Sequence, residues 1–108
     1  LATSQVTPSL YDDVMSLGPF GQGAAEPVFA LKDVEITHVR PIGENHLKLT
    51  VEDAGGRIDV LAWRSVGTPI GDAALQKGRV TLAGKLKDND WNGRRSAQIE
   101  LIDIAAAI

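Results

Sequence analysis

The sequence predicts an all-β domain built on a small five-stranded barrel, on three observations. From Val28 onward, hydrophobic side chains recur at every second residue in five separate runs, which is the period of strands with one buried face. One short segment of helical character separates the third run from the fourth. Gly84 stands inside the fourth run, and a glycine in a strand often marks a bulge or a sharp bend of a closing sheet. The length of 108 residues suits one domain with one core.

The N-terminal part of the chain predicts a short helix followed by a connector. In TPSLYDDVMSLG, Thr7 suits the N-cap and the proline after it suits the first helical position. Leu10, Val14 and Leu17 fall on one face of this helix, and the following Gly-Pro pair ends it. The stretch over residues 18–27 is rich in glycine and proline, so we expect a connector there.

Five strands are expected after this connector. They cover residues 28–40, 46–52, 57–63, 79–87 and 96–104. In the second strand, Leu47, Leu49 and Val51 alternate with polar side chains, so one face is buried and the other is exposed. The stretch DAGG between the second and third strands predicts a hairpin loop.

The order of these elements predicts the barrel type. DAALQKG suggests a short helix between the third and fourth strands, with Asp72 as its N-cap and Gly78 as its stop. DNDWNG predicts the turn between the last two strands. Three strands, a helix inserted before two further strands, and the glycine inside the fourth strand are the order expected of a five-stranded OB-type barrel. In this chain an N-terminal helix plus connector precedes the barrel.

Charge and composition narrow the classes of function. The formal net charge is −3, but residues 1–30 hold three of the acidic residues and no base, so the rest of the chain carries 11 of each sign. Between Lys77 and Arg95, six bases face two acids. The chain has no cysteine, which excludes disulfides and thiolate metal sites and makes a cytoplasmic setting the default expectation. No apolar run approaches the ~20 residues that span a bilayer, so no membrane is expected as a partner.

We expect a binding module and no enzyme in this chain. It has two histidines and no HExxH, Walker or GxSxG motif, and we predict neither a catalytic residue nor a metal ligand. OB barrels hold single strands with the face of their second and third strands and with the loops that join strands one to two and four to five. The candidate DNA-binding residues in these places are Arg40, His46, Lys48, Arg57, Lys85, Lys87, Trp91, Arg94 and Arg95.

Three aromatic residues of this set and its surroundings have alternative roles. For Trp91, stacking on a base and folding back over the barrel end are both open. His46 lies on the polar side of its strand beside Lys48, where a surface role is favoured over a phosphate contact. Trp63 is the other candidate for stacking on a base, but it follows an apolar run, so covering the edge of the barrel is favoured over stacking.

Three stretches of the chain resemble a known family. SLGPFGQGAAEPVF, VRPIGENHLKLTVED and NDWNGRRSAQIELIDI are similar, in this order, to the carboxyl-terminal region of the RecJ family of bacterial single-strand-specific 5′ to 3′ DNA exonucleases. The resemblance runs from about Leu17 to Ile104. The family usually has Asn-Pro where this chain has Ala24-Ala25.

The resemblance implies that the chain has two parts and that the catalytic residues lie outside it. Residues 28–108 would be an OB domain that helps to seat single-stranded DNA, and residues 1–27 a helix and connector from the end of a preceding domain. The family's Asp-His-His motif and its other metal-ligand aspartates precede this region, and Asp-His-His does not occur here. No catalytic residue can therefore be carried over, and manganese or magnesium would belong to a nuclease core outside this chain. Because the chain begins with Leu1, we expect it to be a fragment of a longer protein.

Two hypotheses follow. The first is a single-stranded-DNA-binding accessory domain of a RecJ-like exonuclease in DNA repair or recombination, non-catalytic in this fragment. Its partners would be single-stranded DNA and its own nuclease core, with the single-stranded-DNA-binding protein as a further candidate. The alternative is a protein-interaction or interdomain packing module with little DNA contact, which the acidic N-terminal part and the apolar helix face favour.

Overall fold

The computed structural model describes residues 1–17, 27–76 and 78–106. The predicted connector, including the Ala24-Ala25 departure, lies outside the described residues except for Pro27. The side chain of Trp91 also lies outside the described part, although its backbone belongs to a strand.

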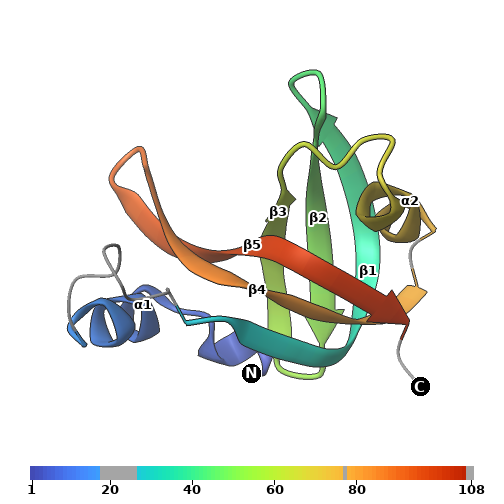
Figure 1. Ribbon diagram of the computed structural model, residues 1–108. Helices are drawn as coiled ribbons and strands as arrows, with labels where there is room; N and C mark the ends of the chain where they lie inside the picture. Colours follow the sequence, from blue (N-terminus) through green and yellow to red (C-terminus); the bar gives the residue numbers. More distant parts are fainter. Residues whose placement is uncertain (18–26, 77, 107–108) are drawn as a thin grey trace.

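The chain forms a closed five-stranded barrel, which confirms the predicted fold class (Figure 1). Its strands are β1 (Phe29–Ile42), β2 (His46–Asp53), β3 (Gly56–Ala62), β4 (Gly78–Trp91) and β5 (Arg94–Ala106). They close in the order β1-β2-β3-β5-β4, with every pair antiparallel except β3 and β5. A helix, α2 (Pro69–Leu75), connects β3 to β4, as expected of the OB type.

The core forms because alternate residues of each strand face inward. In β2, Leu47, Leu49 and Val51 are buried as predicted, and in β3 Val60 and Ala62 are buried. Directly opposed residues of neighbouring strands share a face, so the inward sets of adjacent strands meet. The outward face of β2 is polar, and that of β3 carries Arg57 and Asp59 together with Leu61.

Gly84 allows β4 and β5 to approach closely at the predicted bend. A Cβ atom at this position would lie 2.4 Å from the carbonyl oxygen of Glu100 and 2.5 Å from Cγ2 of Ile99. The register of the β4–β5 pair shifts between Ala83 and Gly84. The missing side chain thus allows the irregularity with which the sheet curves and closes.

The hairpin of β4 and β5 is longer than predicted. Pairing continues to Trp91 and resumes at Arg94, so DNDWNG is mostly strand and only Asn92 and Gly93 form the turn. These two residues have φ values of 53° and 73°, which an Asn-Gly pair adopts in a tight hairpin turn whose twist matches that of the strands. We call residues 87–98 the β4–β5 arm, which projects from the barrel in Figure 1.

The helix boundaries correct two predictions. Thr7 caps α1 (Pro8–Met15) by accepting a hydrogen bond from the amide of Leu10, as predicted. The helix ends at Met15, however, so Leu17 lies beyond it and is 76% exposed. The N-cap of α2 is Thr68, not Asp72, because the same Thr-Pro signal that starts α1 also starts α2.

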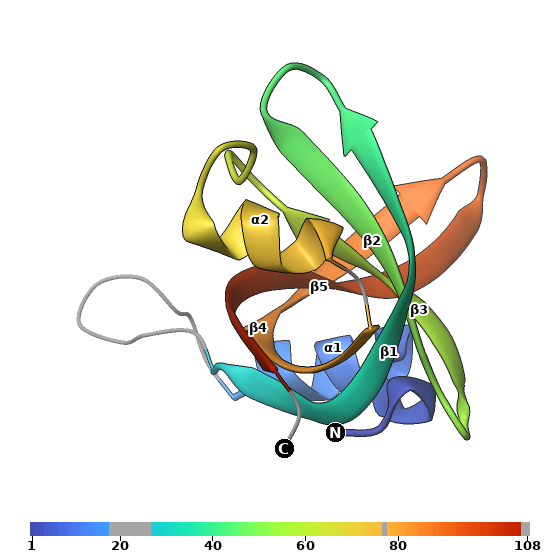
Figure 2. The same ribbon diagram turned by 90° about the vertical axis from the view of Figure 1, so that its right-hand side faces the viewer.

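The N-terminal segment packs against the barrel. Val6 and Val14 belong to the same hydrophobic core as the strands, and α1 contacts β4 and β5. A short 3₁₀ helix, η1 (Thr3–Gln5), contacts β2 and β3, where Thr3 donates two hydrogen bonds to Asp53. Figures 1 and 2 show α1 and α2 at opposite ends of the barrel. The domain division at residue 27 stays a prediction. None of the described helices is long and apolar enough to cross a membrane.

Candidate nucleic-acid interface

Three of the predicted cations, Arg40, Lys48 and Lys85, lie in one row across the outer face of the barrel. Arg40 in β1 pairs with Lys48 in β2, which pairs with Leu61 in β3. Leu61 pairs in turn with Glu100 in β5, and Glu100 with Lys85 in β4. Because directly paired residues share a face of the sheet, these side chains all lie on the outer face of the barrel.

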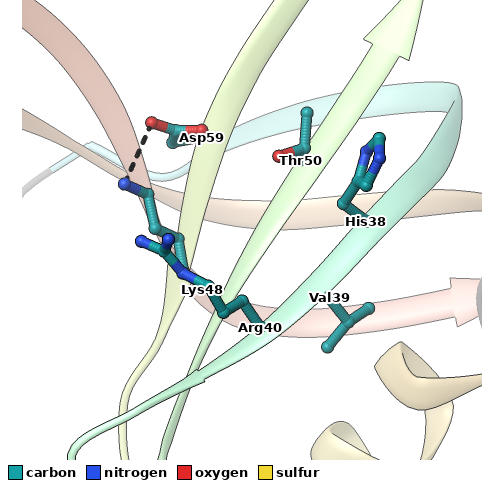
Figure 3. A pocket seen from close by; sticks show the side chains of 6 residues that line it. All are labelled: His38, Val39, Arg40, Lys48, Thr50 and Asp59. Atoms are coloured by element: carbon teal, nitrogen blue, oxygen red, sulfur yellow. Dashed lines mark ion pairs between the residues drawn. The ribbon is translucent and has the colours of Figure 1, made fainter.

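A groove of about 460 Å³ crosses this face over β1, β2 and β3. We call it the first groove, and its lining residues are His38, Val39, Arg40, Lys48, Thr50 and Asp59. Figure 3 shows the Lys48 ammonium turned toward Asp59, with which it forms an ion pair at 3.4 Å. Within the described residues, the Arg40 guanidinium makes no hydrogen bond or ion pair, so its donors face solvent.

A second groove of about 410 Å³ lies between the start of α1, β3 and β5. It is lined by Val6, Thr7, Pro8, Arg57, Ile58, Asp59, Arg95, Ser96, Ala97 and Gln98. Asp59 lines both grooves, so the two adjoin at this carboxylate. Together they place Arg40, Lys48, Arg57 and Arg95 along one path.

Arg95 is already engaged within the protein. Its Nη1 donates to Asp12 of α1 at 2.8 Å and its Nε donates to Asp88 of β4 at 2.9 Å, while the guanidinium carbon lies 6.0 Å from the centroid of the Tyr11 ring. The hydrogen bond from Arg95 lowers the pKa of Asp12, and the hydrogen bonds to Asp12 and Asp88 raise the pKa of Arg95. Arg95 therefore ties the β4–β5 arm to α1.

The other cations of the predicted set are spread over the arm and its base. Lys87 pairs in register with Gln98, and Arg94 lies exposed beside the turn, opposite Trp91. Since successive residues of a strand point to opposite faces, Arg94 and Arg95 do not share a face of the arm. The sequence therefore predicted a set of cations that the structure divides between the grooves and the arm.

His46 and Trp63 form a small aromatic cluster beside the first groove. The Nδ1 atom of His46 accepts a hydrogen bond from the amide of Arg64 at 2.8 Å, and its ring meets the indole edge-on with centroids 5.0 Å apart. Arg64 has a φ of 54°, so His46 fixes a turn in which the backbone is strained. The indole Nε1 donates to the carboxylate of Glu100 at 2.9 Å, and 44% of Trp63 stays exposed.

Sequence reasoning missed two residues of this region and left a third out of the candidate set. His38 and Asp59 were not considered as binding residues, and Thr50, although expected on the outer face of its strand, was not among the candidates; all three line the first groove. Strand alternation could have found them, because Thr50 lies two residues after Lys48 and pairs with both His38 and Asp59. Among the described residues, no three His, Asp or Glu side chains are arranged to hold a metal ion.

The fold and these grooves define an OB-type barrel domain with cations along its outer face. The chain belongs to the RecJ OB domain family, whose model matches residues 1–103. It is 32% identical to the single-stranded-DNA-specific exonuclease RecJ of Dickeya dadantii, over 92% of this chain and 17% of the relative. It is also 32% identical to the single-stranded-DNA-specific exonuclease RecJ of Thermus thermophilus, over 90% of this chain and 13% of that protein.

Solved structures of RecJ share this fold. The crystal structure of Thermus thermophilus RecJ in complex with Mg²⁺ matches with a TM-score of 0.67 and 27% identity, over 96% of this chain and 15% of that one. The structure of the same protein in complex with Mn²⁺ matches with a TM-score of 0.63 and 28% identity, over 94% and 14%. The chain thus spans less than a fifth of the length of the relatives that it matches.

Proposed function

We propose that this chain is the single-stranded-DNA-binding accessory domain of a RecJ-type 5′ to 3′ exonuclease that acts in DNA repair or recombination. The first groove carries the proposal, because it brings Arg40, Lys48 and His38 to the outer face of β1 and β2. The nuclease chemistry, with its Mn²⁺ or Mg²⁺, would belong to other parts of a longer protein in the cytoplasm. Residues 1–27 would lead from the domain that precedes the barrel.

Each part of the grooves has a role in holding a single strand. The Arg40 and Lys48 heads supply donors for phosphate oxygens, and the Thr50 hydroxyl between His38 and Asp59 can donate a further hydrogen bond. Arg57 continues the path into the second groove. Phosphate contacts of this kind carry no sequence information, so binding should tolerate any sequence.

The affinity of the chain on its own should be weak and salt-dependent. The formal net charge is −3, and Asp59 partly neutralises Lys48. For single strands, log K falls with log salt at a slope of about −0.7 for each neutralised phosphate, so three contacts give a slope of roughly −2.

A titration with oligo-dT at low salt tests the proposal. The double variant R40A/K48A should lose most of the affinity and flatten the salt slope by roughly 1.4, because two phosphate contacts are removed. The double variant K32A/R79A is the matched control, since it removes the same charge from residues that line neither groove. Absence of binding at submillimolar oligo-dT, or an equal loss in both variants, would contradict the proposal.

A second candidate function is packing against other domains or proteins. Val66, three residues before α2, and Leu75, the last residue of α2, are 45% and 53% exposed, and such apolar side chains suit an interface with the nuclease core or with the single-stranded-DNA-binding protein. In the longer protein, V66S/L75S should then weaken domain association, seen as easier proteolysis between domains, while the oligo-dT affinity stays unchanged. Loss of oligo-dT affinity without a change in proteolysis would speak against this second candidate.

A further inference from the structure

Trp63 is an exposed indole that the structure holds in one orientation. Its Nε1 donates to Glu100 and its ring meets His46 edge-on, at an interplanar angle of 80°. His46 is itself fixed by the hydrogen bond from the Arg64 amide. Despite these contacts, 44% of Trp63 is exposed. A large aromatic surface is thus fixed at the molecular surface instead of being packed away.

The indole lies on the same side of the barrel as the cations of the first groove. Trp63 lies in the turn directly after β3, where its indole donates to Glu100, the register partner of Leu61 on the outer face. Its ring also contacts His46, which lies two residues before Lys48 in β2. Residues two apart on a strand share a face. The aromatic surface therefore continues the outer face on which Arg40 and Lys48 stand.

The chemistry of the fixed indole indicates its ligand. Its one hydrogen-bond donor is used by Glu100, so what it offers to a ligand is the apolar π-surface. A nucleobase of a flexible single strand combines such a surface with phosphates on either side, and Arg40 and Lys48 can take these phosphates. A fixed platform also loses little conformational freedom when the ligand binds.

We infer that Trp63 is the platform on which a base of single-stranded DNA stacks, with the neighbouring phosphates on Lys48 and Arg40. The inference rests on the proposed function and makes it more specific, because it assigns base contact to a residue that the sequence placed at the barrel edge. A duplex is not the ligand, since its bases are already stacked on each other.

Two oligomers and three variants test this inference in the 108-residue chain. The ligands are oligo-dT and an abasic deoxyribose-phosphate oligomer of equal length, which has the phosphates without the bases. W63A should weaken oligo-dT binding by about 5- to 150-fold, while W63F keeps most of the affinity. V66A is the control, since Val66 is equally exposed but not aromatic. On the abasic oligomer, the parent chain and W63A should bind alike.

Fluorescence gives a readout that does not depend on truncating Trp63. In the W91F variant, Trp63 is the only tryptophan, and its emission should be quenched by oligo-dT but not by the abasic oligomer. If the parent chain binds oligo-dT but W63A binds it equally well and no quenching occurs, the stacking role is overturned and the DNA-binding function stands. If the parent chain binds neither oligomer at low salt, both fail.

Discussion

Asp59 is the carboxylate that both grooves share, and replacing it by asparagine is expected to strengthen the binding of single-stranded DNA. In the parent chain, the Asp59 carboxylate lies 3.4 Å from the Lys48 ammonium. It therefore neutralises part of the lysine's positive charge and repels a phosphate that binds nearby. Asparagine keeps the size and most of the hydrogen-bonding capacity of the side chain. The change therefore removes the negative charge and little else.

The geometry sets the size of the effect. A phosphate oxygen that contacts Lys48 at about 2.8 Å, on the side away from Asp59, lies roughly 6 Å from the carboxylate. Both side chains are partly exposed, at 30% and 40%, so a water-like dielectric applies. The repulsion between two unit charges at this distance is then about 0.7 kcal/mol, which corresponds to about threefold in affinity. A second phosphate nearby would increase the gain.

The assay is a titration with fluorescein-labelled oligo-dT, followed by anisotropy at several low salt concentrations. D59N should bind about threefold more tightly than the parent chain, and its salt dependence should steepen by up to about 0.7 in slope, because Lys48 then needs a counterion in the free state. D33N is the matched control. It changes the net charge equally, but Asp33 pairs with Arg79, and neither residue lines either groove.

Two results would refute this reasoning. If D59N binds no more tightly than the parent chain, the strand does not follow the path that Asp59 divides. If D33N gains as much affinity as D59N, the effect comes from net charge alone and not from a local groove.

Three further changes test the architecture that holds the grooves. R95M should release the β4–β5 arm from α1, seen as faster amide exchange in the arm and an upward shift of the Asp12 pKa in carboxyl NMR titrations. Hydrogen bonds from Thr3 and from the amides of Gly55 and Gly56 lower the pKa of Asp53, so its stabilising effect is present above the ordinary aspartate range and is lost as pH falls through the lowered value. D53N should therefore lose less stability than the parent in urea unfolding between pH 6 and pH 3. G84A should cost about 3 kcal/mol or more in the same assay. G55A should cost less, because a Cβ there would meet only side-chain atoms of Ser4 and Asp53, at 3.1 Å and 3.4 Å; equal costs would contradict the close approach at Gly84.

The faces of the central strands could be predicted from the sequence because burial decides them. Leu47, Leu49 and Val51 recur at every second residue and are all buried, so the intervening Lys48 had to point outward. Two of the six residues that line the first groove, Lys48 and Thr50, follow from this alternation alone. The close approach at Gly84 was predictable for a similar reason, since a strand position without a side chain has few other uses.

The length of the β4–β5 arm could not be predicted from composition. DNDWNGRR is polar and rich in turn-forming residues, which is typical of loops. A hairpin ladder, however, is held by backbone hydrogen bonds, and its end is set by the two residues that can take positive φ, here Asn92 and Gly93. The polar residues before and after them can therefore remain in strands.

The roles of the twin arginines depend on contacts that no local pattern contains. Asp12, which binds Arg95, lies 83 residues away along the chain, and only the packing of α1 beneath the arm brings the two together. Arg94, on the opposite face of the same strand, has no such partner among the described residues. Two adjacent cations that look equivalent in the sequence therefore differ in their contacts. Arg95 holds the arm against α1, whereas the donors of Arg94 are exposed and unpaired within the described residues.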